Sequence, residues 1–163
     1  VFILTLLLLT TPSNASLSSL EKALQHEIQQ HRGTVGLFFY DIESKQSIGI
    51  KETELFNPAS VIKIPVMVEC FRQVESGLHN FDDMTRLRHD HILSGSGQLQ
   101  FQKPGQRYSL KRLLDQMMIH SDNTATNILI EFLGMHHINN TLLEFDLDDT
   151  ILGTPNLLDA LNS

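Results

Sequence analysis

The sequence of 163 residues predicts an α/β (α+β) fold that contains several helices and an antiparallel pair of strands. Apolar residues recur at helical spacing over residues 17–31 and again after residue 109, which indicates amphipathic helices. β-branched and aromatic residues are concentrated at 34–41, as in a buried strand. A short polar stretch, 43–45, separates this strand from a second one, and so short a connection makes the two strands antiparallel.

The remaining elements follow from the same patterns. Gly33 ends the first helix, and the second strand is expected at about 46–52. A helix that is apolar on more than one side runs from about Ser60 to Val74. Residues 78–108 are polar and irregular and should form a long connection with at most short helices. Three further helices are expected. The first follows Ser109 as its cap, the second covers about 124–133, and the third covers about 136–144.

Composition limits the classes of partner. An apolar fraction of 41% suits one domain with a core, and the net charge of −7 argues against a nucleic-acid partner. No Lys or Arg occurs after Arg112. The histidines at 26 and 31 and at 89 and 91 lack the spacing or the setting of metal ligands, so we expect neither a metal nor a cofactor. The single Cys70 cannot form an internal disulfide and should be a buried apolar residue. We expect a monomer.

The first nine residues are almost entirely apolar and are too few to span a bilayer, but they suit the apolar region of a secretory signal. Ser13-Asn14-Ala15 follows as a small-residue cleavage site. We therefore expect residues 1–15 to be a signal peptide, residues 16–163 to be exported to the periplasm or secreted, and no membrane span after cleavage.

The motif Ser60-Val61-Ile62-Lys63 places a serine and a lysine three residues apart at the expected start of a helix. Residues with this spacing share one helix face, so the lysine amine can reach the serine hydroxyl. A serine becomes a nucleophile when a neighbouring group takes its proton. A second match, Ser19 to Lys22, is explained by Ser19 as a helix cap and needs no chemistry.

A second motif, Ser121-Asp122-Asn123, lies at the expected junction of two helices. It arises by chance only about 0.04 times in a chain of this composition. Taken separately, Ser60 and Ser121 also suit helix caps, and Asp122 and Asn123 suit an ordinary turn. The two motifs together favour a catalytic interpretation.

With both motifs, the chain resembles the penicillin-interacting serine enzymes, and most closely the class A serine β-lactamase family. The resemblance extends over about residues 17–152. It implies a β-lactamase/transpeptidase-like fold, with an antiparallel sheet flanked by helices, an all-helical part, and the active site in the groove between them. Residues 16–163 would then be an incomplete catalytic domain that lacks the C-terminal strands and is inactive alone.

The resemblance also implies roles for the motif residues. Ser60 would be the nucleophile that opens the lactam, and Lys63 would help to remove its proton. Ser121 would pass a proton to the departing nitrogen. Asn123 would bind the substrate's side-chain amide and Lys63, while Asp122 would brace the loop. The backbone N–H of Ser60 would serve as an oxyanion donor.

Two family features are missing from the sequence. The Lys-Thr-Gly strand is absent, because no Lys or Arg follows Arg112. Asn156 falls where the family's deacylating glutamate is expected, and Asp159 is the nearest acid. An acyl-enzyme without that glutamate should persist, which favours penicillin binding over efficient hydrolysis.

These observations leave three hypotheses. The first is a class A-type serine hydrolase that opens β-lactams and so confers antibiotic resistance. The second is a D-Ala-D-Ala peptidase that acts on peptidoglycan stem peptides through the same acylation step. The third is a non-catalytic exported domain that keeps the fold.

Overall fold

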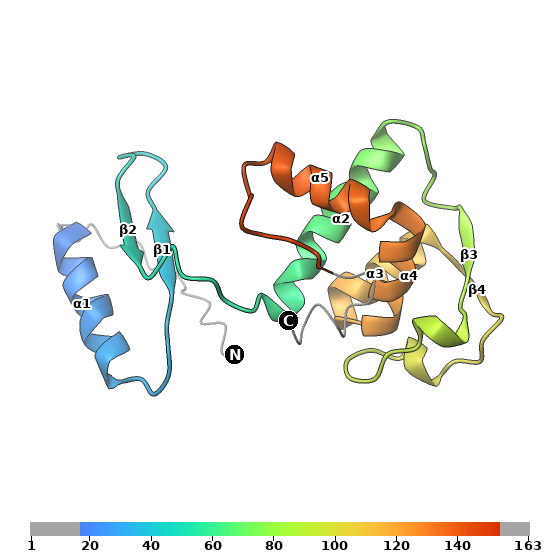
Figure 1. Cartoon of the computed structure of the whole chain (residues 1–163), viewed down its shortest axis with the longest axis horizontal. Coiled ribbons are helices and arrows are strands. Elements are labelled where there is room, and N and C mark those ends of the chain that lie inside the picture. Colours follow the sequence, from blue (N-terminus) through green and yellow to red (C-terminus); the bar gives the residue numbers. More distant parts are fainter. Residues whose placement is uncertain (1–16, 154–163) are drawn as a thin grey trace. The chain divides into compact units, whose positions relative to one another are not determined.

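The structure, a computed structural model, describes residues 17–153. The expected signal peptide, residues 1–15, and the positions Asn156 and Asp159 lie outside the described residues. The chain divides into two compact units, Val1–Phe56 and Asn57–Ser163 (Figure 1). All the candidate site residues belong to the second unit.

In the described part of the first unit, residues 17–56, there are one helix and the expected strand pair. Helix α1 spans Leu17–Gln30, and strands β1 (Leu37–Tyr40) and β2 (Ser47–Ile50) are antiparallel, with Leu37 opposite Ile50 and Tyr40 opposite Ser47. The turn between them is organised by Asp41, whose carboxylate accepts hydrogen bonds from the backbone of Glu43 at 2.9 Å and from the hydroxyl of Ser44 at 2.7 Å. Such a turn stabilises the antiparallel pairing that the sequence predicts.

The expected burial of the first strand is wrong. Phe38 and Tyr40 are 66% and 47% exposed. Ile48 is the only apolar residue between 17 and 56 that is buried. A sheet of two four-residue strands has too little surface to bury both of its faces, so the aromatic side chains of β1 stay accessible.

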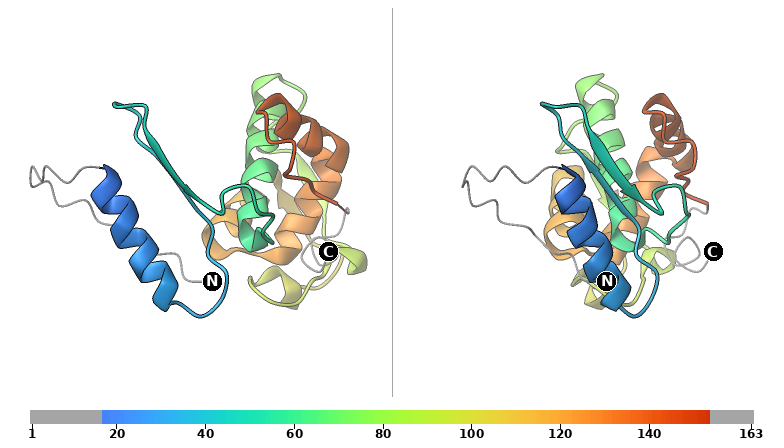
Figure 2. Two further views of the ribbon diagram at one scale, coloured as in Figure 1. Left: turned by 60° about the vertical axis from the view of Figure 1, so that its left-hand side comes forward. Right: turned by 90° about the vertical axis from the view of Figure 1, so that its left-hand side faces the viewer.

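The second unit is built on four helices that pack against one another (Figure 2). They are α2 (Lys63–Glu75), α3 (Leu110–His120), α4 (Asn123–Leu133) and α5 (Met135–Glu144). All four were expected from the sequence. The helix expected from Ser60 begins as a 3₁₀ turn, Ala59–Ile62, and becomes α-helical at Lys63.

The core of the second unit lies around α4. Every residue from Thr124 to Ile130 is buried, as expected for a helix that is apolar on most sides. Leu113 and Met117 of α3 and Val66 of α2 are among the residues that complete this core. Cys70 is fully buried there, as predicted, and burial raises the pKa of its thiol to about 11.

The connection 78–108 contains a strand pair that the sequence pattern did not predict. Strands β3 (Met84–Arg86) and β4 (Arg107–Ser109) are antiparallel, with Thr85 opposite Tyr108. Two short 3₁₀ turns, His89–His91 and Leu99–Phe101, lie between them. Three-residue strands are too short to show the alternation of apolar and polar residues by which a strand is recognised, so the pattern indicated an irregular connection.

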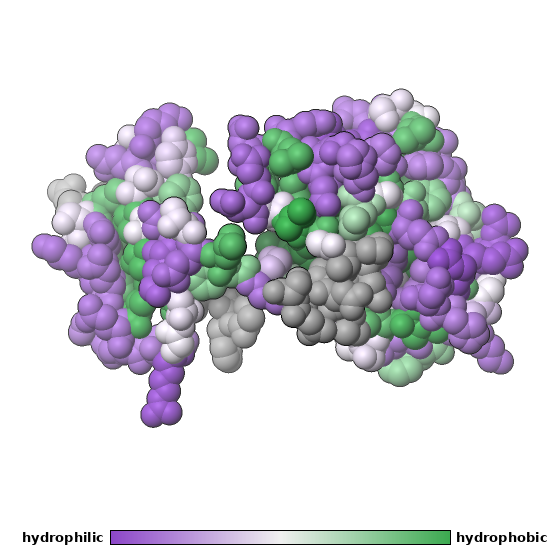
Figure 3. Space-filling view, in the orientation of Figure 1, coloured by the Kyte–Doolittle hydropathy of each residue, from purple (hydrophilic) through white to green (hydrophobic). Residues whose placement is uncertain are grey.

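Apolar side chains lie among polar ones on the surface of both units (Figure 3). In the second unit they include Ile64 and Phe71 of α2, which are 48% and 49% exposed. No helix between residues 17 and 153 combines the length and the apolar composition that crossing a membrane requires.

Candidate active site

Ser60 and Lys63 lie on consecutive turns at the start of α2. Ser60 is exposed in the 3₁₀ turn, and Lys63 is the first residue of the α-helix. Ala59 adopts a left-handed conformation, with φ 46°, and its N–H donates to the side chain of Asn57 at 2.9 Å. Left-handed backbone is costly for a residue other than glycine and is frequent next to catalytic groups.

Ser121 stands at a sharp reversal between α3 and α4. It has φ 52° and ψ 34°, so the chain leaves α3 in a left-handed turn. Asp122 follows as the N-cap of α4 and accepts a hydrogen bond from the N–H of Ala125 at 2.9 Å. The reversal brings both the hydroxyl and the carbonyl oxygen of Ser121 to Lys63.

Lys63 Nζ is the centre of a compact polar cluster. It donates to the carbonyl oxygen of Ser121 at 2.7 Å and to the Ser121 hydroxyl at 2.9 Å. It also lies 2.9 Å from Oδ1 of Asn123 and 3.4 Å from Oγ of Ser60. The two hydroxyl oxygens, of Ser60 and Ser121, are 3.0 Å apart. The Ser60 hydroxyl, the Lys63 amine and the Ser121 hydroxyl are therefore mutually within reach of proton transfer.

The environment of Lys63 lowers the pKa of its amine. The side chain is only 2% exposed, and this burial lowers the pKa of the amine, with the charge of Asp122 opposing the shift. Its four acceptors are hydroxyl and carbonyl oxygens, none of them charged. A buried lysine without a carboxylate partner loses its proton more easily and can then act as a base.

Asp122 is fully buried and does not join this cluster. Its carboxylate accepts from the backbone N–H groups of Ala125, on its own helix, and of Leu99, at 2.8 Å. Gly97 packs directly on it, because a Cβ atom at residue 97 would lie 2.1 Å from Cγ of Asp122. Asp122 therefore joins the loop that contains Leu99 to the start of α4.

Asn123 has its amide oriented from both sides. Oδ1 accepts from Lys63, and Nδ2 donates to the carbonyl oxygen of Ser94 at 3.2 Å. The backbone N–H of Asn123 donates to the carbonyl oxygen of Ser96 at 3.1 Å. The side chain is thus held between Lys63 and the loop 94–97.

The loop 94–97 belongs to the connection 78–108, which the sequence pattern indicated only as irregular. In the structure it supplies the two carbonyl oxygens that hold Asn123. A signal for this role is present in the sequence, because Gly95 and Gly97 flank Ser96 and both adopt positive φ, 113° and 101°. Glycines allow the loop backbone to approach the Asp122-Asn123 pair closely.

The structure thus brings together four of the five predicted site residues, Ser60, Lys63, Ser121 and Asn123, and places Asp122 behind them. Among residues 17–153, no group of three or more His, Cys, Asp or Glu side chains is arranged to hold a metal ion. A nucleophile, a buried amine and a second hydroxyl in hydrogen-bond contact form a set that can carry out acyl transfer.

Several known structures are similar to this chain. The chain is 32% identical to PBP-A, with a TM-score of 0.79, and the match covers 86% of this chain and 54% of that one. A mutant PBP-A solved as an acyl-enzyme complex with penicillin G matches equally well. A β-lactamase from Sphaerobacter thermophilus is 28% identical, with a TM-score of 0.75, over 82% of this chain and 51% of that one. The chain therefore spans about half the length of these relatives.

Comparison with curated protein sequences gives no match. A family model described as the β-lactamase enzyme family matches residues 19–162, nearly the whole chain and both motifs. By this match, the chain belongs to the β-lactamase enzyme family.

Proposed function

We propose that the protein carrying this chain is a serine hydrolase of the class A β-lactamase type, which opens β-lactam rings through an acyl-enzyme on Ser60. The observation that carries this proposal is the contact of one buried amine, Lys63 Nζ, with both Ser60 Oγ and Ser121 Oγ. Membership in the β-lactamase enzyme family supports it.

The hydrogen bonds of Lys63 suit a general base. A neutral amine has two N–H groups and one lone pair, and two of its neighbours, the carbonyl oxygens of Ser121 and Asn123, can only accept. When both N–H groups are used on these oxygens, the lone pair is left for a hydroxyl. Lys63 then takes the proton of Ser60 while Oγ attacks the lactam carbonyl carbon.

Collapse of the tetrahedral intermediate breaks the bond between the carbonyl carbon and the lactam nitrogen. The Ser121 hydroxyl gives its proton to that nitrogen and recovers one from the Lys63 ammonium, 2.9 Å away. The backbone N–H of Ser60 stabilises the oxyanion, and Asn123 binds the substrate's side-chain amide. The net result is an ester on Ser60 and an amine at the former lactam nitrogen.

The test is covalent labelling of the whole protein that carries these residues, with intact-mass measurement as the readout. Incubation with a penicillin should add the mass of one penicillin. The Ser60→Ala variant should stay unlabelled, whereas Ser19→Ala, which removes the serine of the other S-x-x-K match, should label like the unaltered protein. A protein that is not labelled, or a Ser60→Ala variant that is, rules out the assignment of Ser60.

A D-Ala-D-Ala peptidase is the second candidate. It is favoured by Asn156, which stands where the deacylating glutamate is expected. Both functions share acylation at Ser60 and differ in the fate of the acyl-enzyme. Comparing turnover of a chromogenic cephalosporin with release of D-alanine from a stem peptide distinguishes them, and a penicillin label that persists for hours favours the peptidase.

The third hypothesis, a non-catalytic exported domain, makes the opposite prediction about Lys63. If the domain only binds a ligand, replacing Lys63 leaves binding unchanged and no covalent adduct forms.

Export itself is tested by fractionation: a mature protein that begins at Ser16, found outside the cytoplasm, is the expected result.

A further inference from the structure

Residues 88–96 run along α4 in the opposite direction, and four side chains of α4 hold them in place. The contacts lie on one side of the helix, because the residues involved are spaced by about one turn. Glu131 binds the side chains of Arg88 and His91, and Asn127 donates to the carbonyl oxygen of His91 at 3.2 Å. Thr124 binds the backbone N–H and the carbonyl oxygen of Leu93. Asn123 donates to the carbonyl oxygen of Ser94.

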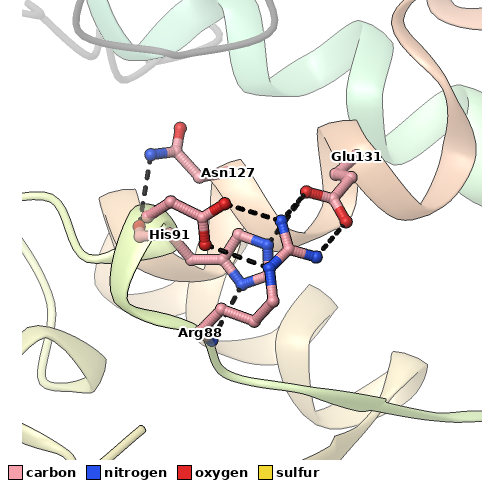
Figure 4. Close-up of polar contacts among 5 residues, drawn as sticks. Arg88, His91, Asn127 and Glu131 are labelled. Carbon is pink, nitrogen blue, oxygen red and sulfur yellow. Dashed lines mark hydrogen bonds and ion pairs between the residues drawn. The ribbon is translucent and has the colours of Figure 1, made fainter.

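The contacts between residues 88–96 and α4 form a row, and the end of this row at Arg88 and Glu131 is an ionic cluster (Figure 4). The Arg88 guanidinium binds Glu131 through two N–H groups and Asp90 through two more, at 3.0 and 2.8 Å. The buried ring of His91 accepts from the backbone N–H of Arg88 at 3.2 Å, so its other nitrogen carries the proton and donates to Glu131 at 3.1 Å. Both ring nitrogens are satisfied, which holds the turn 88–91 in one orientation against α4.

The other end of the row is Asn123, the first residue of α4, which lies in the candidate active site. The carbonyl oxygen of Ser94 can only accept, so it keeps the Nδ2 side of the Asn123 amide toward the loop and the Oδ1 side toward Lys63. The loop that carries this carbonyl contains two glycines, Gly95 and Gly97. Its position therefore depends on where it is anchored.

We propose that Arg88, His91 and Glu131 are positioning residues for acylation, which hold the loop 91–96 so that its carbonyl oxygens orient Asn123 toward Lys63 and the substrate. This proposal rests on the proposed function of Ser60. The three residues touch neither the nucleophile nor Lys63, and they act through the row of contacts along α4.

The ionic cluster contributes more to geometry than to stability. The side chains of Arg88 and Glu131 are 47% and 51% exposed, and ion pairs in such positions stabilise a fold only weakly. Loss of the Glu131 charge should therefore move the loop without unfolding the protein. A purely structural role would change the melting temperature and leave acylation of the folded protein unaffected.

The experiment compares Glu131→Gln with Glu144→Gln in the whole protein that carries this chain. Glu144 is a matched control, because it is also a half-exposed glutamate paired with an arginine, Arg72, but it lies on α5. In Glu131→Gln we expect faster hydrogen exchange at the backbone amides of Leu93 and Asn123, measured by NMR. We also expect acylation by a fluorescent penicillin to slow by about ten- to a hundredfold. Glu144→Gln should change neither quantity.

A double-mutant cycle with Asn123→Ala shows whether Glu131 acts through Asn123. If it does, Glu131→Gln has little further effect on acylation once Asn123 is replaced. An equal loss in both backgrounds, or unchanged amide exchange in Glu131→Gln, overturns the proposal. If the unaltered protein is never labelled, the proposed function fails instead, and the exchange measurement still decides whether Glu131 positions the loop.

Discussion

The hydroxyl oxygens of Ser60 and Ser121 lie 3.0 Å apart, although the two residues are separated by 61 positions in the chain. One belongs to the 3₁₀ turn before α2 and the other to the left-handed turn between α3 and α4. The buried amine of Lys63 lies within 3.4 Å of both. A proton taken from Ser60 can therefore be passed to Ser121 without any large movement of side chains.

Replacing Lys63 tests its role as the base. Lys63→Met keeps the length of the side chain and removes the amine, so acylation should fall by about 10²–10⁴-fold. Lys111→Met, at a lysine that is 64% exposed on α3, should have no effect. Stopped-flow measurement of acylation by a fluorescent penicillin gives both rates, and a Lys63 variant that is acylated at the normal rate contradicts the assignment.

The pH dependence of acylation should report the same amine. Burial lowers the pKa of Lys63 below its ordinary value of 10.5, and in the proposed mechanism the neutral amine is the base. Acylation should therefore rise with pH through this lowered pKa and fall as the pH drops below it. Because the unfolded lysine binds its proton up to a higher pH, stability should also rise with pH between the two values. A rate profile whose midpoint lies at or above 10.5 argues against Lys63.

Two variants of Ser121 separate the effect of its hydroxyl on acylation from the effect of its backbone conformation on stability. Ser121→Ala and Ser121→Gly both remove the hydroxyl, so both should slow acylation to a similar extent. The residue has φ 52°, and glycine adopts this conformation without strain, so the glycine variant should be more stable than the alanine variant by about 1 kcal/mol. Thermal unfolding gives this comparison, and equal melting temperatures would show that the left-handed turn is not strained.

Gly97 and Gly105 form a second matched pair, because both have positive φ, 101° and 97°. A Cβ at Gly97 meets Asp122, whereas a Cβ at Gly105 meets nothing within 4 Å. Both alanine variants carry the cost of the backbone conformation, but only Gly97→Ala displaces Asp122 from the N–H of Leu99. That lost hydrogen bond should add about 1–3 kcal/mol to the destabilisation. Urea unfolding measures the difference, and an equal loss in both variants contradicts the packing argument.

Cys70 should be chemically inert in the folded protein. It is fully buried, and its raised pKa of about 11 leaves the thiol protonated at neutral pH. Iodoacetamide should therefore not modify it until the protein is unfolded in urea, where modification should be complete. Rapid labelling of the native protein would show that the core around α2 and α4 opens easily.

The sequence by itself determined the helices and the first pair of strands. Helical periodicity located α1 to α5 to within a few residues, because amphipathic patterns of ten or more residues are distinctive. The two motifs, Ser60 to Lys63 and Ser121 to Asn123, selected the residues that meet in the candidate site. The exposure of the aromatic side chains of β1 and the pairing of β3 with β4 were not predictable from local patterns, since burial and pairing both depend on partners far away in the chain.

Only the tertiary structure decided how these residues meet. The packing of α2 against α3 and α4 places Lys63 beside a carbonyl oxygen and a hydroxyl from another part of the chain, and removes it from water. It also turns the loop 91–96 into the support of Asn123. Gly95 and Gly97 signal a close approach of this loop, but the local sequence does not identify its partners on α4. Hydrophobic burial brings the helices together without regard to the polar groups, and each buried polar group must then find a partner. Which partner Lys63 finds is therefore a property of the packed helices and cannot be derived from either motif alone.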